Sequence, residues 1–188
     1  MSPTAILAVE DERLPAIDSS EFVTVRLPFV HPFGTSVHTW SVKEALLLRL
    51  AGNGATAWGE CVADPDPFYL PETTISCRHI IRHFLLPLVR PGMTVGEMLR
   101  EFDHVRGNRM AKATVENAIL VLLAGQKQAP LHTLLGFPAK PVMSGLSIGL
   151  KGSPEELVDA VAGAVEKKYH RVKMKVSRGK DVDYVRAV

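Results

Sequence analysis

The sequence predicts an α+β region followed by the beginning of a parallel α/β domain. Short apolar segments typical of strands occupy the first third of the chain, and helical periodicity occupies the middle. The segment 141–188 then follows a strand–helix–strand–helix order. Antiparallel strands can be joined by tight turns, whereas parallel strands need a crossover between them. We therefore expect one domain over residues 1–135 and the start of a second over residues 136–188.

A three-stranded antiparallel meander is predicted at the beginning of the chain. Three short segments are rich in β-branched or apolar residues: 22–27, 43–50 and 55–60. The last two flank Gly52-Asn53-Gly54, and Asn-Gly favours the tight turn of a hairpin. Segments 28–40 and 61–71 contain several prolines and are predicted to be loops.

The middle of the chain predicts three helical segments. Apolar residues recur at helical spacing in the first, and Pro87 should end or kink it. The apolar residues at this spacing are Ile80, Ile81, Phe84, Leu85 and Leu88. A capping box from Thr94 to Glu97 predicts a helix over 95–105. Residues 110–124 are apolar on nearly every side, which predicts a buried helix that ends before Gly125.

The final third predicts parallel strands joined by a helix. Segment 141–149 is expected to be a short buried strand, 171–176 a second strand, and 181–188 the start of another helix. Ser153 can cap the intervening helix, Pro154 suits its first position and Glu156 completes a capping box. The apolar stripe of this helix consists of Leu157, Val161, Ala164 and Val165.

Composition excludes several classes of protein. Of the 188 residues, 46% are hydrophobic and 22% are charged, which is ordinary for a globular protein, and the net charge is only +2. No nucleic-acid partner is therefore expected. No apolar run reaches the ~18 residues of a membrane span, and the N-terminus has no signal-peptide pattern. Cys61 and Cys77 do not form a CxxC pair, so we expect two reduced thiols in a cytoplasmic protein without a membrane partner.

The most informative chemistry lies in Lys173-Met174-Lys175. Residues i and i+2 of a strand share a face, so both ammonium groups point the same way. Their repulsion is expected to lower the pKa of at least one lysine, which would let it act as a base near neutral pH. The alternative is a solvated lysine face of an ordinary sheet. Ser147 lies near the end of the preceding strand, where its hydroxyl either contacts a ligand or bonds to its own backbone.

Other polar residues give weaker indications of a site. Cys77, His79 and His83 lack the spacing of a zinc motif and are expected to be partly exposed positions on an amphipathic helix. Arg109 either pairs with a carboxylate or positions its loop. Glu116 lies within the apolar helix, where a structural role is favoured over a catalytic one.

Several segments together resemble one family. They are PFGTSVHTWSVKEALLLRL, AWGECVADPDPFY, RGNRMAKATVENA, PLHTLLG, GLSIGL and YHRVKMKVSRGKDVDYVRAV. The combination resembles the muconate-cycloisomerase subgroup of the enolase superfamily, and within it the o-succinylbenzoate synthase / N-acylamino acid racemase family. The resemblance implies an α+β capping domain followed by the first two βα units of a truncated (β/α) TIM-like barrel. A complete barrel takes ~250 residues.

The resemblance also implies roles for individual residues. Lys175 would be the acid/base that moves a proton α to a carboxylate, and Lys173 would tune it. Ser147, Phe33 and Tyr69 match substrate-contacting positions. Mg²⁺ or Mn²⁺ is expected for the family, but its ligands lie on later barrel strands, so no metal ligand is predicted in this chain.

The implied partner is a small-molecule carboxylate, and the full-length protein is expected to be a homo-oligomer. The 188-residue chain alone is expected to be inactive. Two alternatives stay open. One is another muconate-cycloisomerase-type enzyme, either a cycloisomerase or a dipeptide epimerase. The other is a non-catalytic truncated remnant that binds a partner or oligomerises.

Overall fold

The computed structural model describes residues 9–34 and 39–188. These residues form two compact units. Unit 1 contains residues 9–30 and 42–139. Unit 2 contains residues 31–34, 39–41 and 140–188, so the end of the first hairpin groups with the C-terminal segment. The predicted domain boundary between residues 135 and 136 stays a prediction. No helix among the described residues is long and apolar enough to span a membrane.

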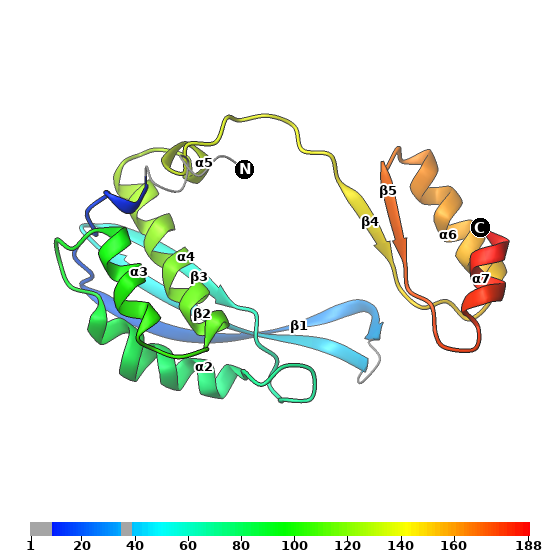
Figure 1. Cartoon of the computed structure of the whole chain (residues 1–188), viewed down its shortest axis with the longest axis horizontal. Helices are drawn as coiled ribbons and strands as arrows, with labels where there is room; N and C mark the ends of the chain where they lie inside the picture. The colour runs from blue at the N-terminus through cyan, green and yellow to red at the C-terminus, as the bar shows by residue number, and fades with distance from the viewer. Residues whose placement is uncertain (1–8, 35–38) are drawn as a thin grey trace. The chain divides into compact units, whose positions relative to one another are not determined.

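A three-stranded sheet forms the first layer (Figure 1). Its strands follow chain order: β1 (Ser19–Gly34), β2 (Thr39–Gly52) and β3 (Ala55–Cys61). β2 and β3 pair antiparallel, with Gly52 opposite Ala55. Asn53 and Gly54 between them have φ values of 50° and 76°, the left-handed pair that a two-residue hairpin turn needs. The predicted meander and its Asn-Gly turn are confirmed.

The predicted loop over 28–40 is wrong over most of its length. β1 continues through Pro28 and Pro32 to Gly34, and β2 already begins at Thr39. Residues 35–38 lie outside the described part of the chain. Within the described part of the chain, β1 pairs with β2 alone, and an edge strand tolerates proline because half of its N–H groups need no partner in the sheet.

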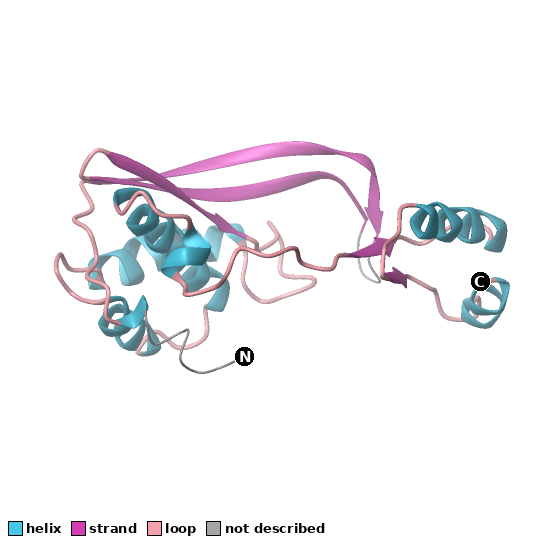
Figure 2. Cartoon of the chain, turned by 90° about the horizontal axis from the view of Figure 1, so that it is seen from above, coloured by secondary structure: helices cyan, strands magenta, loops and turns pink. Residues whose placement is uncertain are grey.

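Helices gather on one face of this sheet (Figure 2). They are α2 (Thr74–Ile80), the π-turn η1 (Ile81–Leu85), the 3₁₀ turn η2 (Leu86–Leu88), α3 (Val95–Asp103), α4 (Arg109–Gln126) and α5 (Leu131–Leu134). The capping box of α3 is confirmed. The Glu97 N–H donates to the Thr94 hydroxyl at 3.2 Å, and the Thr94 N–H donates to the Glu97 carboxylate at 2.7 Å.

One helical expectation is wrong, and one apolar residue at helical spacing is not buried. Phe84 is 48% exposed rather than in the core, because the wider π-turn rotates this side chain away from the face that carries Ile81 and Leu85. Gly125 lies inside α4 rather than after it. Gln128 follows the helix and has the left-handed backbone conformation, with φ 51°. The Ala129 N–H then donates to the Ala124 carbonyl at 3.0 Å.

The core of unit 1 lies between the sheet and α4. Leu48 and Leu50 of β2 and Val115 and Ile119 of α4 are all fully buried. β3 approaches α4 closely at Gly59, where an added Cβ would stand 2.0 Å from the Thr114 carbonyl oxygen. Glycine is therefore required for this contact between strand and helix.

Unit 2 contains one parallel strand pair with a helix after each strand. The elements are β4 (Gly145–Ile148), α6 (Pro154–Glu166), β5 (Arg171–Met174) and α7 (Asp181–Ala187). β4 and β5 pair parallel. The buried core of unit 2 consists of Ile148 from β4, Leu157 from α6 and Tyr184 from α7. The predicted strand–helix–strand–helix order is confirmed.

Three details of unit 2 differ from expectation. The first strand is shorter than 141–149 and mostly exposed, because only one of its faces packs on helices and Ile148 alone in it is buried. β5 ends at Met174, although the Lys175 N–H still donates to the Ile148 carbonyl at 3.0 Å. Ser153 caps α6, but the Glu156 carboxylate accepts from the Gly152 N–H rather than from the Ser153 N–H, so the capping box is not completed. Val165 is 62% exposed and so lies outside the buried stripe of this helix.

Candidate active site

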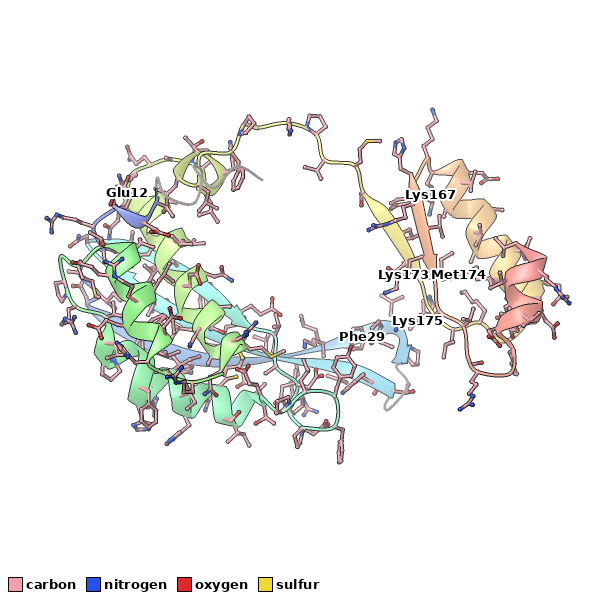
Figure 3. The ribbon with its side chains drawn as sticks, viewed as in Figure 1. Glu12, Phe29, Lys167, Lys173, Met174 and Lys175 are labelled. Atoms are coloured by element: carbon pink, nitrogen blue, oxygen red, sulfur yellow. The ribbon has the colours of Figure 1, made fainter. Side chains whose placement is uncertain are left out.

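The two faces of the β4–β5 pair have different chemistry. Leu146, Val172 and Met174 face the helices and pack against the buried cluster around Ile148. Lys173 and Lys175 project from the opposite side of the strand to Met174 (Figure 3). This alternation follows from the twofold repeat of a strand. The packed apolar face therefore fixes the direction of both ammonium groups.

Ser147 shares the face of the lysines. It is the register partner of Lys173 in the parallel pair, and both side chains are exposed. Neighbouring strands lie about 4.8 Å apart, so a hydroxyl and an ammonium group are presented side by side. The sequence placed both residues on strands, and the structure adds that they are paired neighbours.

The Lys175 side chain is held by the hairpin end that belongs to unit 2. Its Nζ donates to the Gly34 carbonyl at 2.8 Å and stands 4.1 Å from the centroid of the Phe33 ring. Phe33 in turn lies 6.4 Å from Trp40, centroid to centroid. A carbonyl oxygen and an aromatic face both attract a cation, so both contacts are favourable for the Lys175 ammonium group.

Unit 2 therefore holds four of the five residues singled out in the sequence: Phe33, Ser147, Lys173 and Lys175. Tyr69 belongs to unit 1, in the loop after β3, and is 58% exposed. An exposed aromatic side chain on a loop is free to meet a ligand, but Tyr69 and the lysine face belong to different units.

Glu72 is an important residue that sequence reasoning missed. Its carboxylate accepts from the Met110 N–H at 3.0 Å and the Ala111 N–H at 3.2 Å, two donors in the first turn of α4. Asn108, the residue before this helix, is left-handed at φ 50° and makes no capping bond with its side chain. No local signal reveals this cap, because Glu72 and Met110 are 38 residues apart.

The two cysteines also form a group that the sequence did not indicate. Cys77 is fully buried, so its expected partial exposure is wrong. Cysteine behaves as a small apolar residue, and this one packs on the core side of α2. The neighbouring Cys77 thiol lowers the pKa of the Cys61 thiol, while the interaction with Cys61 and burial raise the pKa of Cys77. The Cys77 Sγ also lies 3.5 Å from the Glu72 carboxylate.

The remaining polar candidates do not form a metal centre. Cys77 points into the core, whereas His79 and His83 are exposed, with ring centroids 4.8 Å apart. Across residues 9–34 and 39–188, no three His, Cys, Asp or Glu side chains gather where they could hold an ion. The described residues therefore do not fit a Mg²⁺ ion. Glu116 is half-buried in α4, and loss of solvent raises the pKa of its carboxyl group.

One protein family and several known proteins are similar to this chain in sequence. Residues 19–136 match the family described as mandelate racemase / muconate lactonizing enzyme, N-terminal domain. An N-succinylamino acid racemase from Amycolatopsis is 35% identical over 170 residues, covering 89% of this chain and 46% of that protein. An o-succinylbenzoate synthase from Geobacillus kaustophilus is 36% identical over 160 residues, covering 84% and 43%.

A solved structure from Listeria innocua, described as a member of the enolase superfamily, is similar in fold. Its TM-score is 0.84 at 32% identity, with 94% of this chain and 48% of that one covered. The chain thus spans about half the length of the curated relatives it matches.

Proposed function

Because the chain belongs to the mandelate racemase / muconate lactonizing enzyme family of the enolase superfamily, we propose that it supplies the proton-handling half of an enzyme acting on a small carboxylate. The reaction would remove the proton α to the carboxylate, as an o-succinylbenzoate synthase or an N-succinylamino acid racemase would. One observation carries the proposal. Lys173 and Lys175 share one strand face, and the opposite side of the strand is fixed by packing of Met174 (Figure 3).

Lys175 is assigned the acid/base role. Its Nζ donates to the Gly34 carbonyl at 2.8 Å. A deprotonated amine can keep such a bond through one N–H, so this contact can orient the nitrogen while its lone pair takes the α-proton. Lys173 is assigned a tuning role, because it presents a second ammonium group on the same strand face as Lys175 (Figure 3). Ser147 would orient the substrate from the adjacent strand.

Phe33 and Tyr69 are assigned to the substrate contact. Both side chains are substantially exposed on the hairpin end and the loop after β3. Enolase-superfamily sites also use Mg²⁺ to stabilise the ene-diolate. The described residues gather no carboxylate set that fits this ion. The part of the chemistry assigned to this chain is therefore proton transfer and substrate contact.

The test joins this chain to the second half of a relative. Residues 1–176 are fused to the complementary barrel segment of the Amycolatopsis racemase, and α-proton exchange of N-succinylamino acids in D₂O is followed by NMR with Mg²⁺ present. We expect exchange in the fusion, its loss in Lys175→Ala, and nearly full exchange in Lys167→Ala, which removes an exposed lysine at the end of α6.

The same fusion separates the two reactions and tests the assignment. Formation of o-succinylbenzoate measures dehydration, while inversion of N-succinylamino acids measures racemisation. A folded fusion that exchanges protons equally well with Lys175→Ala would refute the acid/base assignment. A folded fusion with no exchange on either substrate class would favour the non-catalytic alternative. The 188-residue chain alone is expected to show no exchange.

A further inference from the structure

Two pairs of side chains lie along the helical segment formed by α2 and η1. The first pair is Arg78 and Arg82, whose guanidinium carbons stand 5.5 and 5.4 Å from the centroid of the Phe22 ring. Arg78 also donates to the Thr24 hydroxyl at 3.2 Å, and Phe22 packs on the core of unit 1. The arginine pair is therefore anchored on β1 and fixes which side of the helical segment faces the sheet.

The second pair is His79 and His83, each one position after an arginine. Successive residues of a helix are rotated by about 100°, so the histidines leave the segment on a neighbouring side, and both are exposed. Their ring centroids are 4.8 Å apart, with the ring planes at 43°. The Phe84 ring contacts the His79 ring in a T-shaped arrangement, 5.7 Å between centroids. The two imidazoles are thus open to solvent and held near each other by the backbone.

The separation of the two rings matches that of two imidazoles on one metal ion. A transition metal binds an imidazole nitrogen at about 2.0–2.1 Å, which places the ring centre about 3.2 Å from the ion. Two such ligands at an angle of about 90–109° then have ring centres about 4.5–5.2 Å apart. The observed 4.8 Å lies within this range. His79 and His83 therefore need no change of backbone to share an ion.

We propose that His79 and His83 chelate one divalent transition-metal ion of the Ni²⁺, Cu²⁺ or Zn²⁺ type, with water completing the coordination shell. Imidazole nitrogens favour these ions, whereas Mg²⁺ favours oxygen ligands. The part of the chain that the structure describes gathers no third His, Cys, Asp or Glu side chain around such an ion. The site is therefore a two-ligand surface chelate and not a closed centre with three or four protein ligands.

The bound ion would join two helical turns of different type. His79 lies in the last turn of α2, and His83 lies in the π-turn η1, where the Leu86 N–H donates to the Ile81 carbonyl five residues earlier. Such π-turns are rare and are found frequently at functional sites. An ion that binds only the folded arrangement stabilises it by mass action. The ion is therefore expected to protect the junction of α2 and η1 against local unfolding.

This site is independent of the proposed function. It lies in unit 1, whereas Lys173 and Lys175 belong to unit 2. The charges of Arg78 and Arg82 oppose a cation nearby, so binding is expected to be weaker than at a site with carboxylate neighbours.

The first experiment uses the untagged 188-residue chain and Ni²⁺, which does not oxidise thiols. Isothermal titration calorimetry in a buffer that does not bind metals should give one ion per chain, released by EDTA. At a free Ni²⁺ concentration of about 100 times the Kd, the unfolding midpoint should rise by at least about 5 °C. Hydrogen exchange should slow in residues 78–85, where the two ligands lie.

Variants identify the ligands among the seven histidines of the chain. His79→Ala and His83→Ala should each lower the affinity for Ni²⁺ at least about tenfold, because each removes one of two bonds to the ion. The double variant should bind no more weakly than either single variant, because one remaining imidazole is no better than any other lone histidine. His104→Ala is the matched control, since it removes an exposed histidine at the end of α3, and it should leave the affinity unchanged. Far-UV circular dichroism shows that each variant is folded.

Four results would overturn the proposal. The unmodified chain could fail to form a complex with one Ni²⁺, or both single variants could keep its full affinity. Each single variant could instead halve the number of bound ions at unchanged affinity, which would show two separate sites. His104→Ala could also weaken binding as much as His79→Ala. None of these outcomes bears on the proposed function, because that is tested by proton exchange in the fusion protein.

Discussion

Replacement of Glu72 should weaken the start of α4 more than the loss of an ordinary surface carboxylate. Glu72 accepts from two backbone donors of this helix, on Met110 and Ala111, and Asn108 provides no side-chain cap. Removal of Glu72 leaves the Met110 and Ala111 N–H groups without this hydrogen-bond acceptor near the core. Hydrogen bonds to a charged group contribute about 1.5–3 kcal/mol each, and a lost helix cap costs about 0.5–2 kcal/mol.

Water can reach this partly exposed site and replaces some of the lost bonding. We therefore expect Glu72→Ala to lower the free energy of unfolding of unit 1 by about 2–3 kcal/mol. Glu72→Gln keeps one acceptor oxygen but loses the charge that interacts with the helix dipole, and about 1–2 kcal/mol is expected. Asp103→Asn is the control, because it removes an exposed carboxylate at the end of α3.

The assay is urea unfolding followed by tryptophan fluorescence in a Trp40→Phe background. The chain has two tryptophans, and Trp58 on β3 then reports on unit 1 alone. Hydrogen exchange at the Met110 and Ala111 amides provides a local measurement, and protection should fall at these two positions first. If Glu72→Ala and Asp103→Asn unfold within about 0.5 kcal/mol of each other, Glu72 does not cap α4 and the reasoning fails.

Three further predictions concern single side chains. Gly59→Ala should destabilise unit 1 by at least about 3 kcal/mol in urea unfolding, because the new Cβ would stand 2.0 Å from the Thr114 carbonyl oxygen. The control is Gly54→Ala, which has open space around it and should cost only about 1–2 kcal/mol for its positive φ. Equal losses would contradict this. The folded-state pKa of Glu116 is raised by burial, so its ionisation opposes folding above that pKa, and the penalty disappears as the pH falls below the unfolded value. Glu116→Gln should therefore be more stable than the unmodified chain at pH 7 and lose this advantage near pH 4; a gain at pH 4 only would reverse the sign. Tyr184→Phe removes the 3.2 Å hydrogen bond to the Lys151 carbonyl. Hydrogen exchange of the β4 and β5 amides should then become faster by the equivalent of about 1 kcal/mol. Unchanged exchange would show that this hydrogen bond contributes nothing to stability.

Much of the fold could be predicted because its signals are local. The Asn53-Gly54 turn and the Thr94–Glu97 capping box each involve residues within a few positions of one another, and the structure contains both. The strand through Pro28 and Pro32 could not be predicted in this way. Its prolines are tolerated because β1 lies at the edge of the sheet, and edge position is a property of the assembled sheet.

The candidate site divides along the same line. The shared face of Lys173 and Lys175 follows from strand periodicity alone. The contacts of Lys175 with Phe33 and Gly34, and the cap that Glu72 provides for α4, join segments that are distant in sequence. Burial of Cys77 likewise depends on which side of α2 meets the core. Such pairings become visible only when the tertiary packing is known.

The bond between Lys175 and the hairpin end has a consequence for synthesis of the protein. Its partners are 141 residues apart, and unit 2 needs both segments. At about 5–20 residues per second, a ribosome that has made Gly34 needs roughly 7–28 s more to make Lys175. During that interval the contacts of the hairpin end with Lys175 cannot form, and chaperones or other nascent chains can reach it. Unit 1 can fold while translation continues, whereas completion of unit 2 has to wait until its C-terminal segment has left the ribosome.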